Sequence, residues 1–445
     1  MRSLPARLRR VRVLEPLAER DFALLTAGAF ISLLGDGFFY VALAWQVYEI
    51  SNVPTALSLV GLAWTLPLLL FVLIGGVFSD RYDRRWLMVG ADLIRAAAIG
   101  VLGMLSVTGV LELWHVVALI AFVGLGDAFF NPASTAIVPD LLPEHLLPQA
   151  NALQGLVRPL TVRLVGPALG GLTIAAVGPG TAFLIDGGSF IVSAVSVAAI
   201  APRPRREVVS HGVRQTLVEM REGLAYVRAT PWIWATLISA MLALLVFIGP
   251  EEVLLPFLVK NRLELGPDAL GAIFAAGGVG AVLMAIVVGQ VGLPRRWVTA
   301  MYATWSAGVL LIAGFGLMTE LWHALLLSAA GAALFEVGAI IWLTMLQRLV
   351  PRELLGRVSS LDWLVSIGLV PVSFALTGPV AGVIGAEATL VAGGVVGAIL
   401  MGGLLFYPGV RDPEREPAPT AVLNAADADA DVADEPTATS GVRGP

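Results

Sequence analysis

The chain has 445 residues, of which 57% are hydrophobic and only 14% are charged, and its mean hydropathy is +0.85. A water-soluble domain cannot bury that much apolar surface, so the composition excludes a soluble multi-domain enzyme. The sequence contains no cysteine, which excludes disulfides, Cys-ligated zinc, iron–sulfur clusters and thiol catalysis.

Apolar runs long enough to cross a membrane follow one another along the chain. A membrane helix needs about 20 apolar residues. Helices are expected at 22–48, 55–78, 87–108, 114–138, 152–177, 181–200, 232–258, 268–290, 297–318, 322–346, 358–384 and 386–407. The first run is too long for the core of a signal peptide, so we expect the first helix to be retained. The predicted fold class is therefore an all-α membrane protein with twelve transmembrane helices.

Arginines gather on one side of these predicted helices. They occupy the N-terminal segment, the loops after the second, eighth and tenth spans, the central segment and the tail, whereas the opposite side holds only Lys260 and Arg262. Basic loops favour the cytoplasmic side of a membrane. The sequence therefore predicts a multi-pass protein of the cell (cytoplasmic or inner) membrane with both termini in the cytoplasm.

Polar segments divide the chain into five parts. A cytoplasmic N-terminal segment (1–20) precedes two six-helix bundles, 21–200 and 232–408, and residues 201–231 connect the bundles. In this connector Val213, Leu217 and Leu224 follow helical spacing, which predicts an amphipathic helix on the cytoplasmic membrane face. The tail 409–445 holds eight acids and three arginines beyond Val410, which accounts for the whole net charge of −5. Its composition predicts disorder.

Four short motifs occur once in each bundle, in the same order and at a nearly constant offset. The pairs are Arg84–Trp86 with Arg295–Trp297, Glu112–His115 with Glu320–His323, Pro143 and Leu146-Leu147 with Pro351 and Leu354-Leu355, and Gly166–Gly170 with Gly378–Gly382. Four matches in order indicate a duplicated six-helix unit. Because six is even, both units have the same orientation, and a central site is expected between them near the middle of the membrane.

Three sets of residues resemble the major facilitator superfamily. The stretch Gly76 to Arg85 resembles the superfamily signature of the loop between the second and third helices. Gly166-Pro167-Ala-Leu-Gly170-Gly171 resembles the second half of the antiporter signature in the fifth helix. Asp36 between two glycines, Asn131-Pro132-Ala133 and Gly356-Arg357 resemble the branch of macrolide, multidrug and enterobactin exporters. The resemblance covers residues 20–408 and implies a proton-driven exporter of small molecules with the major facilitator fold.

The signature loop is expected to form a cytoplasmic gate. Gly76 permits close approach of helices, and Asp80 can accept hydrogen bonds at a neighbouring helix N-terminus, such as that of span 11. The basic members Arg81, Arg84 and Arg85 can pair with acids such as Asp140 or Asp362. Such pairs would latch the bundles in an outward-open state and break during inward opening. The alternative is that these charges only set the topology.

The fifth span carries small residues on one face beside a proline, namely Gly166, Pro167, Gly170 and Gly171. Helices can pack closely there, and the proline lets the helix bend because it removes a hydrogen bond. These residues are expected either to seal the outer half of the protein against proton leak or to serve ordinary packing.

Charged residues at membrane depth are costly and usually functional. The predicted set is Asp36, Asp92, Asp127, Asp186, Glu251, Glu252, Glu336, Asp362, Arg95, Arg158 and Arg163. Because burial disfavours a charged carboxylate, such a group can bind and release a proton near neutral pH, as a proton-coupled transporter requires. Asp36 is our first choice for this role, and a structural hydrogen bond is the alternative.

Asp127 and Glu336 occupy nearly equivalent places in the fourth and tenth spans. They are expected to face each other across the central cavity, where either can take the proton or a cationic substrate, and Arg163 is expected to pair with one of these acids. Asp92 and Arg95 are three residues apart and are expected to satisfy each other. Structural roles remain open for Asp127 and Glu336.

The function predicted from these features is proton-coupled efflux of hydrophobic or amphiphilic small molecules, such as drugs, antibiotics or siderophore-like metabolites, by alternating access. Nutrient uptake by symport is the alternative, and a membrane-embedded enzyme or a non-transporting receptor is less favoured. The sequence holds no recognised nucleotide-binding loop, metal-ligand cluster or nucleophile constellation, so no cofactor, metal or catalytic residue is predicted. The expected partners are the substrate, protons and the lipid bilayer, without nucleic acid, and the transporter is expected to be a monomer.

Overall fold

The computed structural model describes residues 12–202 and 213–415. These residues form helices joined by turns, without a β-strand. Twelve helical segments among them are long and apolar enough to cross a membrane, which confirms the predicted fold class. Residues 1–11, 203–212 and 416–445 lie outside this description, and with them most of the predicted N-terminal segment, part of the connector and most of the acidic tail.

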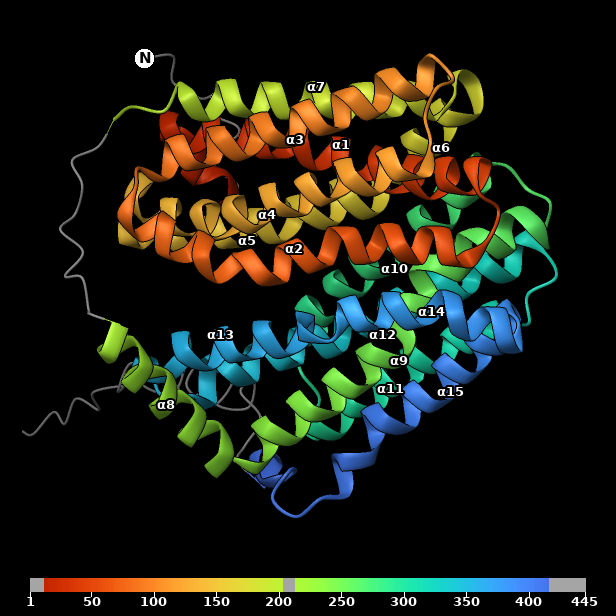
Figure 1. The fold of residues 1–445 in the computed structure, drawn as a ribbon. Coiled ribbons are helices and arrows are strands. Elements are labelled where there is room, and N and C mark those ends of the chain that lie inside the picture. Colours follow the sequence, from red (N-terminus) through yellow and green to blue (C-terminus); the bar gives the residue numbers. More distant parts are fainter. Residues whose placement is uncertain (1–11, 203–212, 416–445) are drawn as a thin grey trace, which may run out of the picture.

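Each half of the molecule contains six spans (Figure 1). The first half comprises α1 (Arg20–Ile50), α2 (Pro54–Arg81), α3 (Arg84–Val107), α4 (Leu113–Leu141), a fifth span made of η3 (Glu144–Leu146), α5 (Leu147–Arg158), η4 (Pro159–Val165) and α6 (Gly166–Val177), and α7 (Pro179–Ala198). The second half comprises α9 (Pro231–Asn261), α10 (Pro267–Val291), α11 (Trp297–Phe315), α12 (Leu321–Leu349), an eleventh span made of α13 (Arg352–Gly368) and α14 (Val370–Ile384), and α15 (Ala386–Gly403). Short 3-10 turns flank them: η2 (Arg12–Ala18), η5 (Leu404–Phe406) and η6 (Asp412–Arg415).

The two halves repeat one packing scheme. In the first half α2 packs along α4, and α7 packs against both α1 and α3; in the second half α10 packs along α12, and α15 packs against both α9 and α11. The halves meet where α6 packs on α10 and where α14 packs on α2. The internal repeat seen in the sequence is therefore a repeat of structure, related by an axis that runs between these two contacts.

The two ends of the bundle differ. We call the end that carries Arg84 and Arg357 the arginine-rich end, and the end that carries Asn52 and Asn261 the far end. Toward the arginine-rich end α5 packs against η2, η4 and α1 of its own half, and α13 packs against α8, α9, α12 and α14 of its own half. Figure 1 shows α5 and α13 diverging in this direction. The described contacts between the halves lie nearer the far end.

The repeated Glu-Leu-Trp-His motif begins α4 and α12 by the same capping arrangement. The Glu112 side chain accepts the backbone N–H of His115, and His115 Nδ1 accepts the backbone N–H of Glu112 at 3.1 Å. Glu320 and His323 repeat this box, with a distance of 3.2 Å from the Glu320 N–H to His323 Nδ1. A capping box satisfies donors that a helix start leaves free. The two histidines thus have a structural role at the helix starts.

Spans 5 and 11 are broken, whereas single runs at 152–177 and 358–384 were predicted. A π-helical segment, η4, interrupts span 5 after Pro159, and span 11 breaks between Gly368 and Val370. Proline lacks an N–H donor, and π segments are frequent at functional sites. Both spans also start earlier than predicted, at Glu144 and Arg352, because the helices extend beyond their apolar runs.

The connector contributes one helix to the described residues, α8 (Val213–Ala229). Glu222 Oε2 lies 2.5 Å from Arg357 Nη1 on α13, and the Tyr226 hydroxyl donates to the carbonyl of Leu349 at 3.4 Å. The helix is therefore attached to the arginine-rich end of the second half (Figure 1).

Candidate functional site: a cavity between the halves

A cavity of about 840 Å³ lies between the halves. Its walls come from Tyr40 on α1, from the fifth span between Arg158 and Pro167, and from all six spans of the second half. Span 11 contributes through α13 and not through α14. The volume is within the range of small-molecule binding sites. The cavity is therefore bounded by both repeats, as the duplicated fold predicts for a central site.

The wall from the second half carries six aromatic side chains among aliphatic and polar ones, namely Phe247, Phe274, Trp305, Phe315, Phe335 and Trp342. The rings of Phe247 and Phe335 lie 5.7 Å apart, and those of Trp305 and Trp342 lie 6.5 Å apart. The Trp305 indole donates to the carbonyl of Phe335 at 3.2 Å, which fixes its orientation. The Trp342 indole donates to Asp362 Oδ1 at 3.2 Å. Rigid aromatic faces with few polar groups suit an apolar or aromatic ligand.

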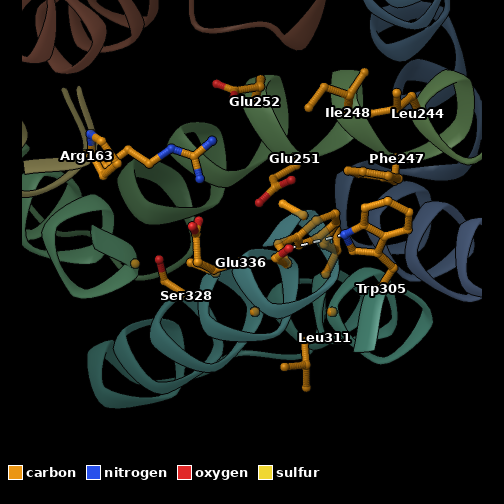
Figure 2. A pocket seen from close by; sticks show the side chains of 18 of the residues that line it. Arg163, Leu244, Phe247, Ile248, Glu251, Glu252, Trp305, Leu311, Ser328 and Glu336 are labelled. Atoms are coloured by element: carbon orange, nitrogen blue, oxygen red, sulfur yellow. Dashed lines mark hydrogen bonds between the residues drawn. The ribbon is translucent and has the colours of Figure 1, made fainter. Parts of the chain in front are cut away.

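The same cavity holds six charged side chains. The acids Glu251, Glu252, Glu336 and Asp362 come from the second half, and the bases Arg158 and Arg163 come from the fifth span of the first half. In Figure 2 the Arg163 guanidinium points into the cavity, toward Glu251 and Glu336. The lining carries a formal charge of −2 when all six groups are ionised. The sequence places all six at membrane depth but does not place Glu251 and Glu252 in the cavity, because an apolar helix gives no periodicity that shows which face is inward.

Asp127 does not face Glu336, contrary to the sequence prediction. Its carboxylate accepts hydrogen bonds from Arg95 Nη1 and from the Trp64 indole, both at 2.9 Å, within the first half. Arg95 also pairs with the fully buried Asp92, as predicted, and lies over the ring of Phe130 at 4.2 Å. Arg95 thus binds two carboxylates, one more than its sequence spacing indicated.

Asp36 is half-buried in α1 and takes part in no hydrogen bond or ion pair found among the described residues. It lies within electrostatic range of Arg95, Asp127 and Arg158. Tyr40, one helical turn later, lines the cavity, so Asp36 lies at the edge of this site. The fully buried Asp186 on α7 is also in electrostatic range of Asp36.

Asp186 is a polar residue that the sequence did not single out. Its Oδ1 accepts a hydrogen bond from Ser189 at 3.2 Å, and its Oδ2 has no partner in the described part of the chain. A Cβ on Gly35 would come within 2.4 Å of this carboxylate, so α1 and α7 approach closely because position 35 is glycine. The contact between α1 and α7 therefore has one carboxyl group on each helix, Asp36 on α1 and Asp186 on α7.

The glycine-rich face of α6 packs between the two halves. A Cβ on Gly166 would lie 2.7 Å from the Cα of Gly37 on α1, and one on Gly171 would lie 3.0 Å from the Cα of Gly271 on α10. Pro167 and Gly170 are buried in the same contact. The antiporter-like run thus brings three helices together at backbone distance, and its three glycines leave no room for a larger side chain at positions 166, 170 and 171.

Hydrogen bonds between the halves close the far end. The Tyr48 hydroxyl donates to the carbonyl of Val253 at 2.6 Å, and Lys260 Nζ donates to the carbonyl of Tyr48. The side-chain amides of Asn52 and Asn261 bond to each other at 2.6 and 3.1 Å. Lys260, the single lysine of the chain, also lies 5.6 Å above the ring of Trp45. The far end is therefore sealed by backbone packing and by polar contacts together.

The signature loop makes its described contacts within the first half. Arg84 Nη1 lies 2.6 Å from Asp140 Oδ2, and its Nη2 lies 4.0 Å from Asp80 Oδ1. Arg85 donates to the carbonyl of Ile200 at 2.5 Å, and Arg81 is exposed. Asp362, the other acid expected in the gate, belongs to the cavity instead, where it accepts from Trp342. The predicted pair Arg84–Asp140 is formed, and the contacts of Arg84 and Arg85 found among the described residues stay within the first half.

Gly76 does not provide a close helix contact, contrary to the sequence prediction. A Cβ there would have no atom within 4 Å, whereas a Cβ on the preceding Gly75 would lie 2.1 Å from the carbonyl oxygen of Ala128 on α4. The close crossing of α2 and α4 thus depends on Gly75. The one-residue difference turns the side chain about 100° around the helix.

Replacing Gly75 with valine is expected to lower the free energy of unfolding by about 1–3 kcal/mol, because the new side chain must push α4 away. Gly76→Val has the same intrinsic helix propensity but meets open space, so it is expected to change stability far less. Unfolding of the detergent-solubilised protein, followed by tryptophan fluorescence, measures both. Equal stability of the two variants would show that Gly75 does not hold this crossing.

A twelve-helix bundle with two repeats around a central cavity is the architecture of a major facilitator transporter. A family model described as transmembrane secretion effector matches residues 12–435. The chain therefore belongs to the transmembrane secretion effector family of the major facilitator superfamily.

Characterised relatives support the exporter branch. The chain is 30% identical over 410 residues to the multidrug efflux pump Tap of Mycolicibacterium fortuitum, covering 89% of this chain and 97% of that protein. It is 29% identical over 392 residues to the enterobactin exporter EntS of Shigella boydii, covering 84% of this chain and 83% of that protein. It is 26% identical to macrolide efflux protein A of Streptococcus pyogenes over 271 residues, 61% of this chain and 66% of that protein. The predicted membership of the exporter branch is confirmed.

Solved structures share the fold at low identity. The nucleoside transporter NupG aligns with a TM-score of 0.64 and 10% identity, covering 86% of this chain and 98% of that chain. A bacterial homologue of the lysosomal transporter spinster, solved inward-facing and unoccupied, aligns with a TM-score of 0.61 and 16% identity, covering 88% of this chain and 97% of that chain. These similarities show the fold alone.

Proposed function

We propose that the chain exports hydrophobic or amphiphilic small molecules out of the cell in exchange for protons, by alternating access. The observation that carries this proposal is the cavity between the halves. Its wall holds aromatic and charged side chains, and the far end of the bundle is sealed. The relatives are named as a multidrug efflux pump, a macrolide efflux protein and an enterobactin exporter, and these names support export over symport.

We place the arginine-rich end in the cytoplasm and the far end outside the cell, with both termini cytoplasmic. The arginine distribution supports this orientation. The conformation described is then the inward-facing one, in which substrate enters from the cytoplasm or the inner leaflet. The membrane is the cell membrane, and the internal duplication supports a functional monomer, because one chain supplies both sides of the cavity.

The outward-facing state needs the reverse arrangement. The contacts of α6 with α10 and of Tyr48 with Val253 must separate, and the arginine-rich end must close. In that state the second half can contact Asp80, Arg81, Arg84 and Arg85. The gate role of these four residues is therefore part of this proposal. Asp140 holds Arg84 in place within its own half at 2.6 Å.

Asp36 carries the exchanged proton in this mechanism. The other first-half acids facing Arg95 are already paired: Asp92 and Asp127 both bind its guanidinium. Among the described residues Asp36 has no such partner, and it lies beside the cavity, so a change in its protonation alters the charge that a substrate meets. Asp186 is buried and binds no cation in the described part of the chain, so a second negative charge next to it is unfavourable.

The decisive test is Asp36→Asn, which removes the exchangeable proton and keeps the side-chain size. We expect it to abolish substrate movement driven by an imposed proton gradient in everted membrane vesicles, with unchanged protein level in the membrane. The matched control is Glu353→Gln, an exposed acid at the start of α13, which is expected to retain efflux. Full gradient-driven efflux by Asp36→Asn would refute the coupling role, and uptake into intact cells would refute the direction.

A further inference from the structure

Arg163 reaches from the first half of the molecule into a group of second-half glutamates. Its backbone belongs to η4, and a Cβ on Gly278 of α10 would lie 2.6 Å from the Arg163 carbonyl oxygen, so the backbone is pressed against the second half. The side chain is exposed to the cavity (Figure 2). It lies within electrostatic range of Glu251, Glu252 and Glu336.

The guanidinium forms no ion pair or hydrogen bond among the described residues, although it faces three carboxylates. Arg95 provides the contrast, since it is buried and bonded directly to two aspartates. Arg95 is therefore a fixed structural cation, whereas Arg163 is a cation held near its partners across open space. A ligand can enter that space without first breaking a bonded pair.

We infer that Arg163 determines charge specificity in the cavity: it competes with an organic cation that bears aromatic or apolar groups for the carboxylates of Glu251 and Glu336. This inference rests on the proposed transport function and names the substrate class of the same site. The lining has more acids than bases, and the partly exposed aromatic rings of Phe274 and Phe335 can hold a cation as well as an apolar body.

The competition also links binding to the movement of the halves. Arg163 is covalently part of the first half, while the glutamates are part of α9 and α12 in the second half. When the halves rock, the distance between Arg163 and these carboxylates changes. In one state the carboxylates bind the substrate, and in another state they lie closer to Arg163. The second state therefore displaces a cationic ligand, whereas a neutral ligand is not displaced by this competition between charges.

Two ions of nearly equal shape and opposite charge test the inference. Tetraphenylphosphonium and tetraphenylborate are measured for binding to the detergent-solubilised full chain by equilibrium dialysis, with no proton gradient present. We expect wild-type protein to bind the phosphonium more tightly than the borate. Arg163→Gln is expected to tighten phosphonium binding by about 3- to 30-fold, the range set by one charge at roughly 8 Å in media between water and a protein surface, and to weaken borate binding.

Three further variants make the result interpretable. Glu336→Gln is expected to weaken phosphonium binding, Arg163→Lys to keep the wild-type preference, and Arg295→Gln, an exposed arginine outside the cavity, to change neither ion. The inference fails if wild-type protein prefers the borate or binds neither ion, or if Arg163→Gln leaves both affinities unchanged in folded protein. Because no gradient is used, loss of coupling in Asp36→Asn would not produce these outcomes, so the two proposals fail separately.

Discussion

Arg95→Met is expected to lower the free energy of unfolding by about 3–5 kcal/mol, the largest stability loss we predict for a single substitution. Arg95 binds Asp92 and Asp127 and lies between the rings of Phe130 and Phe190, each 4.2 Å from its guanidinium carbon. Removing Arg95 leaves the fully buried Asp92 carboxylate without the cation that it binds. Tryptophan fluorescence during unfolding of the detergent-solubilised protein measures the loss.

A triple variant separates charge from packing in this cluster. If the unpaired carboxylates cause the loss, adding Asp92→Asn and Asp127→Asn to Arg95→Met is expected to restore part of the stability, because no buried charge remains. The control Arg295→Met changes an exposed arginine and is expected to stay within about 0.5 kcal/mol of wild type. A triple variant as unstable as Arg95→Met would assign the loss to the contacts with Phe130 and Phe190 instead.

Gly171→Val is expected to abolish most transport while leaving the protein folded. The added side chain would meet the carbonyl oxygen of Pro267 at 2.6 Å and the Cα of Gly271 at 3.0 Å, but only in the conformation with a sealed far end. An overpacking cost of about 1–3 kcal/mol confined to one state shifts the balance between states by roughly 5- to 150-fold. The transporter would then remain open at the far end.

The natural absence of cysteine makes this shift measurable. Ser58 is buried at the far end, where its hydroxyl oxygen lies 3.0 Å from the position of a Cβ on Gly378 of α14, and Ser58→Cys introduces the single thiol. We expect Gly171→Val to increase labelling of this thiol by an impermeant maleimide. Gly188→Val, at a position with no atom within 4 Å of a Cβ, is the matched control. Equal labelling in both variants would mean that Gly171 does not control closure.

The sequence predicted those features that depend on composition and on local spacing. Twelve apolar runs predicted twelve spans, and repeated motifs predicted the duplication, because both are properties of the chain itself. The pairing of Asp92 with Arg95 was also predictable, since three residues along a helix bring two side chains to one face. The closely packed glycines of span 5 could be located because helix contacts of this kind need small residues on one face.

What the sequence left open depends on which face of an apolar helix turns inward. Asp127 was expected in the cavity but is bound by Arg95, a partner 32 residues away on another helix. Gly75 and not Gly76 lies against α4, a choice between neighbours that no periodicity decides when both faces are apolar. The π-helical segment of span 5 that starts at Pro159 was also not predicted, although a proline inside a helix is a known cause of such an interruption.

The breaks in spans 5 and 11 have a mechanical consequence. Each span consists of two short helices joined end to end. The helices near the arginine-rich end, α5 and α13, pack against their own half, whereas those near the far end, α6 and α14, pack against both halves. Two helices joined in this way can tilt by different amounts. A half therefore need not turn as one rigid body. The entrance can widen at one end of the protein while the contacts between the halves at the other end persist.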